Sequence, residues 1–295
     1  MTGFARTFSI LTAITLGALI PHAHVLSGAI RGLVMTMLFI VFLQTRLSRS
    51  DLTRNHLTLF FANVALGFVA FGLGWLVGGR EIALAAFFCG IAPTAIAAPV
   101  IISFLRGRVD FVVACFLLTN VGIAALLPLL LPVVLGRPTP EAFAQVLGSV
   151  SIVVFTPMAL AWLVRALYAG AAKWPEKLRN VSFYMWITTM FLITSNASHF
   201  LRQNADTPRL VLLEIAVVTL VVCAANFALG RWIGGRELGR EASQALGQKN
   251  TTFTIYLALA YAGPIAALGP TCYVIWHNLW NSWQLHRASR ARDFQ

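Results

Sequence analysis

A cation, three amides and several hydroxyls interrupt a segment long enough to cross a membrane. Residues 243–252 read Ser-Gln-Ala-Leu-Gly-Gln-Lys-Asn-Thr-Thr and lie inside the apolar segment 238–261. A charge at this depth is costly and by default marks a functional site. We therefore expect Lys249 to pair with an anionic substrate or to exchange a proton. The ordinary alternative is a lysine that reaches the interface or bonds neighbouring carbonyls.

Other polar residues within apolar segments are candidates to act with Lys249. Glu214 is a candidate counter-charge or coupling group for it, and the alternative is a residue at the membrane interface. Asp110 is expected to complement a helix dipole beside Arg106 and Arg108. The expected substrate-binding residues besides Lys249 are Gln248, Asn250, Thr251, Asn63, Thr94, His277 and Asn278. The alternative for the last two is an aromatic belt at the interface, because three tryptophans share their helix.

The composition requires that these residues be held by membrane helices. Of 295 residues, 58% are hydrophobic and 11% are charged, with a mean hydropathy of +0.78. Soluble domains have about 45–50% apolar and about 25% charged residues. The four cysteines are far apart and form no CxxC pair, which excludes a disulfide scaffold. Although the net charge is +12, the basic residues punctuate hydrophobic runs, which excludes a nucleic-acid binder.

Hydropathy predicts an all-α polytopic protein with ten membrane-spanning helices, each needing roughly 20 apolar residues. Sixteen basic residues fall on the side of both termini and five on the other, so we expect cytoplasmic termini in a plasma (inner) membrane. The first span has an alternative interpretation as a cleavable signal peptide ending near residue 23. The expected spans are residues 7–26, 30–47, 57–77, 82–105, 111–135, 142–167, 178–201, 210–233, 238–261 and 265–285.

The spans divide into two halves of five, residues 1–136 and 137–295, which form a single membrane domain. An odd number of helices per half makes related halves inverted in the membrane, as in many secondary transporters. The fourth helix of each half is interrupted, by Pro93 and Pro99 in the first half and by the polar segment around Gly247 in the second. Paired interruptions point to a transport site where the helices cross. For Pro93 and Pro99, the alternative is an ordinary kinked helix.

Several motifs resemble those of the bile acid:sodium symporter family. They are Gly247-Gln248-Lys249-Asn250, Pro270, Trp276-His277-Asn278, Pro93 and Phe104-Leu105-Arg106-Gly107. Asn63 stands near the place of a family glutamine. The resemblance implies two inverted five-helix repeats whose crossing helices 4 and 9 build the substrate and sodium sites. It also implies substrates that are organic anions, from bile acids to small carboxylates.

The chain departs from this family at the sodium ligands. The positions that match the family's Glu, Gln, Ser, Asn and two further hydroxyls are here Ala245, Lys249, Ala98, Pro99, Val112 and Phe116. Sodium needs several hard oxygen ligands, and these side chains supply none. We therefore expect Lys249 to stand in place of a bound sodium ion, which makes transport independent of sodium.

The function expected from these residues is alternating-access transport of a small organic anion across the lipid bilayer. Protons remain an alternative coupling ion. Other interpretations are a sodium-coupled bile-acid or organic-anion symporter with altered ion sites, and a non-transporting sensor on the same fold. An enzyme is not expected, and neither is a cofactor or a bound metal, because no nucleophile–base pair, acid pair or metal-ligand cluster is recognisable.

Overall fold

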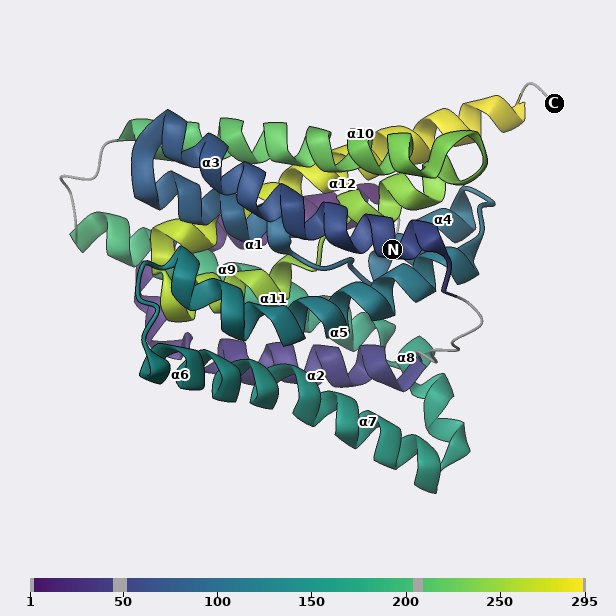
Figure 1. Ribbon diagram of the computed structural model, residues 1–295, viewed down its shortest axis with the longest axis horizontal. Helices are drawn as coiled ribbons and strands as arrows, with labels where there is room; N and C mark the ends of the chain where they lie inside the picture. The colour runs from purple at the N-terminus through teal and green to yellow at the C-terminus, as the bar shows by residue number, and fades with distance from the viewer. Residues whose placement is uncertain (1–2, 45–51, 204–208, 294–295) are drawn as a thin grey trace.

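The structure is a computed structural model that describes residues 3–44, 52–203 and 209–293. These residues are almost entirely helical, and the described part of the chain contains no strand beyond one isolated bridge between Thr94 and Lys249. The helices run roughly along one common direction (Figure 1). This arrangement confirms the expectation of an all-α chain.

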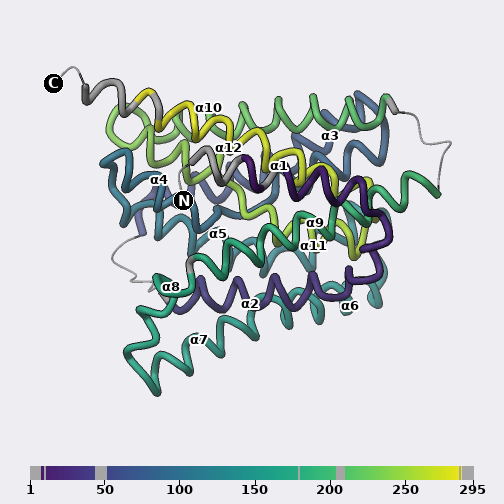
Figure 2. Tube along the Cα trace, turned by 180° about the vertical axis from the view of Figure 1, so that it is seen from behind, coloured from purple at the N-terminus to yellow at the C-terminus, as the bar shows by residue number. Residues whose placement is uncertain are grey.

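One group of helices, which we call the side bundle, combines segments from both halves of the sequence. Figure 2 shows α1 running along α9 on the rear of the molecule, while α2 packs against α7 and α9. A π-helical segment, Ser151–Phe155, joins α6 to α7. The helices of the side bundle are α1 (Gly3–Leu19), α2 (Ala29–Gln44), α6 (Pro140–Val150), α7 (Thr156–Leu167), α8 (Trp174–Lys177) and α9 (Arg179–Gln203).

The remaining helices form a second group, which we call the crossing bundle. Here α3 packs along α10 and α12, and α4 and α5 pack against each other (Figure 1). The helices of the crossing bundle are α3 (Arg54–Ile91), α4 (Ala97–Phe104), α5 (Val109–Val134), α10 (Arg209–Gly247), α11 (Thr251–Tyr261) and α12 (Pro264–Asp293).

Two helices of the crossing bundle fold back on themselves. A straight helix of 38 residues would be about 57 Å long, roughly twice the thickness of a bilayer core. Instead, α3 reverses at Gly78 and Gly79, and α10 reverses at Gly235. Gly79 and Gly235 have φ of +75° and +61°, a left-handed conformation that glycine adopts without steric cost. Each helix is therefore a hairpin of two arms.

Glycines let the two arms of each hairpin touch. A Cβ added at Gly74 would lie 2.6 Å from the carbonyl oxygen of Ile82, and one added at Gly230 would lie 2.4 Å from that of Ala242. Real Cβ atoms do not approach an oxygen so closely. The small residues thus fix the distance between the arms and the direction in which the second arm leaves the turn.

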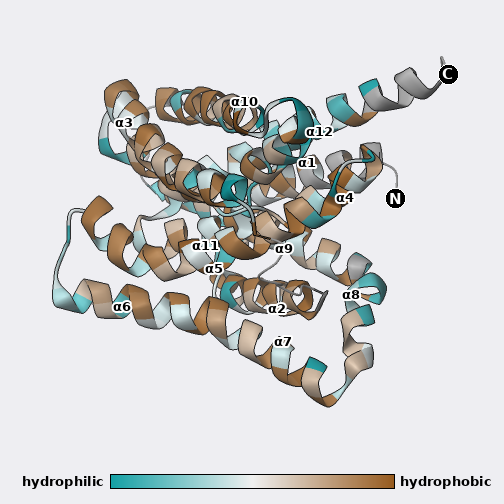
Figure 3. Cartoon of the chain, turned by 45° about the vertical axis from the view of Figure 1, so that its right-hand side comes forward, coloured by the Kyte–Doolittle hydropathy of each residue, from teal (hydrophilic) through white to brown (hydrophobic). Residues whose placement is uncertain are grey.

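The surface of the molecule is suited to lipid. Several large apolar side chains are fully open to the outside, including Leu76 at 85% and Trp232 at 78% exposure. Figure 3 shows hydrophobic residues on the outward faces of α3, α6 and α10. A contiguous apolar exterior marks a membrane-contacting surface. The helices long and apolar enough to span a bilayer are Arg54–Ile91, Val109–Val134, Pro140–Leu167 and Leu210–Gly247, and shorter apolar helices are Ala29–Leu43 and Thr251–Tyr261.

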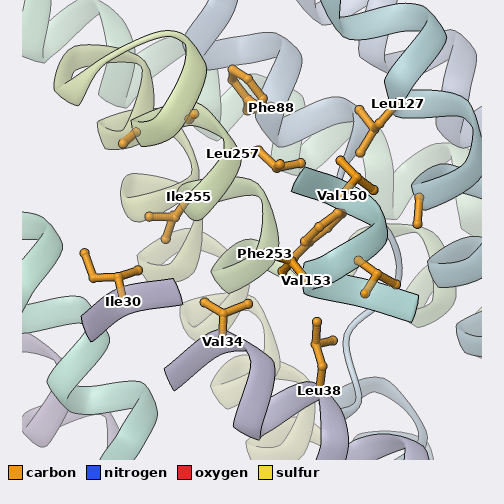
Figure 4. Packing of buried hydrophobic residues seen from close by; sticks show 14 of the residues in the cluster. Ile30, Val34, Leu38, Phe88, Leu127, Val150, Val153, Phe253, Ile255 and Leu257 are labelled. Atoms are coloured by element: carbon orange, nitrogen blue, oxygen red, sulfur yellow. The ribbon is translucent and has the colours of Figure 1, made fainter. Parts of the chain in front are cut away.

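The main hydrophobic core joins the two bundles. Figure 4 shows Val34 of α2 and Val150 of α6 facing Phe253 and Leu257 of α11, with Leu127 of α5 beside them.

The structure also modifies one expected span. The segment predicted as a single helix over residues 7–26 ends as an α-helix at Leu19 and continues as a 3-10 helix from Pro21 to Leu26, because Pro21 cannot donate a backbone hydrogen bond.

Candidate functional site

The crossing bundle is interrupted at two places, residues 92–96 and residues 248–250, and these two breaks pair with each other. The backbone N–H of Ala95 donates to the carbonyl of Gln248 at 2.8 Å, and the N–H of Asn250 donates to the carbonyl of Pro93 at 2.7 Å. Together with the bridge between Thr94 and Lys249, these bonds form a short antiparallel crossing. Backbone groups that each helix loses at its break are thus satisfied by the other break.

Lys249 lies at the centre of this crossing. Its side chain is 1% exposed, and its Nζ donates to the carbonyl oxygen of Gly90 at 2.9 Å and to Oδ1 of Asn63. Asn63 in turn donates from Nδ2 to the carbonyl of Ile91 at 3.0 Å. Gly90 and Ile91 end α3, so their carbonyls have no partner within that helix. The lysine and the asparagine therefore complete the C-terminus of α3, where a positive charge is electrostatically favourable.

The charge of Lys249 is held by neutral oxygens. None of the described carboxylates lies within ion-pair distance of its Nζ. Glu214, the expected counter-charge, lies instead at the reversal of α3, where a Cβ added at Gly78 would meet its Oε2 at 2.7 Å. Asp110 lies 3.7 Å from Arg108 on the surface. A cation surrounded by a backbone carbonyl and an amide oxygen resembles a bound metal cation in its ligands.

Thr94 connects the first break to both α10 and α5. Its buried hydroxyl donates to the carbonyl of Ala245 at 2.6 Å, and its N–H donates to Oγ1 of Thr119 at 3.0 Å. Asn120 donates from Nδ2 to the Thr94 carbonyl at 2.9 Å and accepts from Nδ2 of Asn250 at 3.1 Å. Thr119 and Asn120 are not among the residues expected from the sequence. Their signal is an adjacent polar pair inside the apolar run of α5.

The second break is tied to α12 by amide side chains. Oε1 of Gln248 accepts from Nδ2 of Asn281 at 2.7 Å, and Nε2 of Gln244 donates to Oδ1 of Asn281 at 3.0 Å. The hydroxyl of Tyr273 donates to the carbonyl of Gly247, the last residue of α10, at 2.9 Å. Tyr273, Gln244 and Asn281 were not expected as binding residues. Tyr273 and Asn281 are eight residues apart on α12, which places them about two turns apart on the face toward α10.

The other expected residues occupy different environments. Thr251 is buried in the first turn of α11, while His277 is buried against the ring of Tyr273 with 5.6 Å between ring centroids. Asn278 donates to the carbonyl of Val274 in its own helix. Pro93 lies within the break, but Pro99 lies in the first turn of α4, where a proline costs no helical hydrogen bond. The structure thus gathers Lys249, Asn250, Gln248, Thr251, Asn63 and Thr94 at the crossing and leaves His277 and Asn278 along α12.

The accessible part of the crossing differs from its buried part. Asn250 and Thr252 are half-buried, as are residues 95–97 at the start of α4, whereas the groups that Lys249 binds are buried. The N-termini of α4 and α11 meet at this face, and backbone N–H groups there favour negative charge. Two surface pockets lie elsewhere, one of about 400 Å³ between α1 and α9 and one of about 130 Å³ beside Glu81. An anion at the crossing would therefore contact Asn250 and Thr252 with Lys249 behind them.

Comparison with known protein families and with curated proteins finds no match for this chain.

Proposed function

We propose that this chain is a secondary transporter of small organic anions in which the ammonium of Lys249 takes the place of a bound sodium ion. The observation that carries the proposal is the environment of this ammonium. It joins the Gly90 carbonyl and the Asn63 amide oxygen at the point where two interrupted helices cross. A buried charge at a helix interruption in a membrane protein is a hallmark of a transport pathway.

The two hairpins support an arrangement of ten passes in two inverted repeats. The second arm of α3 runs from Gly79 to Ile91 and that of α10 from Gly235 to Gly247, so both have the same length before the break. Each arm counts as one pass, with α4 continuing the second arm of α3 and α11 continuing that of α10. With α6 and α7 taken as one pass, this gives five passes before residue 137 and five after it. This arrangement is that of the bile acid:sodium symporter family, which the motifs at the breaks resemble. With the basic residues as counted above, both termini are cytoplasmic in a plasma (inner) membrane.

Binding of an anion is favoured by the accessible face of the crossing. The positive dipole ends of α4 and α11 lie at this face, and Asn250 adds an amide. Lys249 supplies positive potential from behind without contacting the ligand directly. Because the ammonium is tethered, the breaks are held together whether or not sodium is present, so the transport step does not require a sodium gradient.

The test is uptake of radiolabelled pyruvate, succinate and cholate into proteoliposomes in sodium or potassium buffer, with and without an imposed pH gradient. We expect at least one of these anions to accumulate above the level of empty liposomes, equally in both salts. Lys249→Met should abolish this uptake, whereas the matched control Lys177→Met, at an exposed lysine of α8, should retain it. Uptake that requires sodium would overturn the role of Lys249, and no uptake of any of the three anions would overturn the transport function.

A further inference from the structure

The two bundles meet unevenly along the proposed transport route. On one side of the crossing, α11 packs chiefly against α12 and α3 of its own bundle and also touches α2 and α9 of the side bundle. On the other side, the main contacts of α4 are with α5 and α10 of its own bundle. The core around Phe253 and Leu257 includes residues of both bundles (Figure 4). A second core around Ile102 and Leu246 is built from α3, α4, α5, α10 and α12. The bundles are thus closed together at α11.

The α4 side shows the opposite condition. Val100 and Phe104 of α4 are 47% and 55% exposed, and they follow the half-buried residues 95–97 along one face of this helix. This face leads from the accessible residues of the crossing to the end of α4. The side bundle does not cover this face, because the main contacts of α4 are with α5 and α10.

Two tyrosines fasten the closed side. The hydroxyl of Tyr256 on α11 lies 3.2 Å from Oγ of Ser149, and the hydroxyl of Tyr261 donates to the carbonyl of Gln145 at 3.3 Å. Gln145 and Ser149 are one turn apart on α6, so both bonds join the same pair of helices.

These contacts have the properties needed for a reversible closure. The apolar core beneath them excludes water from the route, but apolar contacts are not directional. Hydroxyl bonds fix one register of α11 against α6, and both partners can bond water when the bundles separate, so opening leaves no buried polar group unsatisfied.

We propose that Tyr256 and Tyr261, bonded to Ser149 and Gln145, form the gate that closes the α11 side of the anion route. This inference rests on the proposed transport function for the nature of the ligand. The closure itself rests on the hydrogen bonds and on the shared core of the two bundles. Opening this side requires both tyrosine bonds to break while the exposed face of α4 becomes covered.

The test measures access to the crossing from each side of the membrane. Thr252→Cys places a thiol on the accessible face of α11, and a membrane-impermeant maleimide is added to either side of vesicles whose orientation is fixed by protease treatment of a C-terminal tag. The labelling of the parent chain, with its four native cysteines, is subtracted. We expect Thr252→Cys to react from the α4 side and to react slowly from the α11 side.

Combining the reporter with Tyr256→Phe and Tyr261→Phe should raise the rate from the α11 side at least about fivefold, because each net hydrogen bond changes an equilibrium by roughly 2- to 12-fold. The matched control is Tyr184→Phe, an exposed tyrosine of α9. Ser149→Ala removes the α6 partner of Tyr256 and should also raise the labelling rate from the α11 side. This variant provides the test if the double tyrosine variant does not fold.

Two outcomes separate this inference from the proposed function. If the tyrosine variants and Ser149→Ala react from the α11 side no faster than the Tyr184→Phe control, the gate is refuted. Equal labelling rates from both sides for Thr252→Cys with Tyr256, Tyr261 and Ser149 unchanged would also refute the gate. If the rates change as expected but no anion is taken up, the gate stands and the transport function is wrong.

Discussion

Replacing Lys249 with methionine removes the charge and all three donors of the ammonium while keeping an unbranched side chain. The change leaves the Gly90 carbonyl and Oδ1 of Asn63 buried without their donor. Each buried group left unsatisfied costs about 1–3 kcal/mol, and the variant no longer buries a charge, which offsets part of this cost. We expect a net loss of roughly 2–4 kcal/mol in the free energy of unfolding.

The loss should be visible as a lower melting temperature in the absence of any ligand. An unfolding entropy of about 2.1 cal/mol/K per residue converts the expected loss into a decrease in Tm of about 3–6 °C for a chain of this length. The measurement is thermal unfolding of the purified chain in detergent micelles, followed by tryptophan fluorescence. Lys177→Met, on the exposed surface of α8, is the matched control and should change Tm by less than about 1 °C.

A double-mutant cycle identifies the contact responsible. Asn63→Ala alone removes the acceptor of Lys249 and the donor to Ile91. Since the two side chains touch, the effects of Asn63→Ala and Lys249→Met should fall short of additivity by about 1 kcal/mol or more. Equal Tm values for Lys249→Met and Lys177→Met, together with additive effects in the cycle, would show that the ammonium does not hold the breaks together.

Three further predictions test the fold and its ion chemistry. Exchanging sodium for potassium should leave the melting temperature and any anion-induced stabilisation unchanged, and a saturable stabilisation specific to sodium would reveal a sodium site. Reporter domains fused at Gln295 and after Arg137 should report opposite sides of the membrane, and a shared side would refute the ten-pass arrangement. Gly230→Ala should destabilise the chain by about 1–3 kcal/mol, measured by thermal unfolding, because its Cβ would meet the Ala242 carbonyl. The control Gly72→Ala, whose Cβ meets nothing within 4 Å, should be neutral or slightly stabilising.

The existence of both helix interruptions could be predicted from the sequence because their causes are local. Pro93 has no N–H to continue α3, and the segment from Gly247 to Asn250 combines a flexible residue with polar side chains at membrane depth. The reversal of α3 was also signalled, by Gly78-Gly79 between two apolar spans. Such signals depend on a few adjacent residues, and tertiary packing does not change them.

The partners of the buried polar groups could not be predicted in the same way. Asn63 lies 186 residues from Lys249 along the chain, and Asn120 lies 130 residues from Asn250. Their pairing depends on how the hairpins pack, which no local pattern specifies. The same reason explains why Glu214 does not lie beside Lys249. Its position within an apolar segment suggested a counter-charge, but the packing of α3 on α10 places it at the turn of α3.

The pairing of the two breaks has a consequence for the order in which the chain is made. The carbonyl of Gly90 receives its donor from a residue 159 positions later. At about 5–20 residues per second, this donor leaves the ribosome roughly 8–30 s after the carbonyl. During that interval the end of α3 holds unpaired backbone groups inside or beside the bilayer, where each is costly. We therefore expect the first half of the protein to depend on chaperones or insertion machinery until Lys249 is synthesised, and its folding to be completed by the second half.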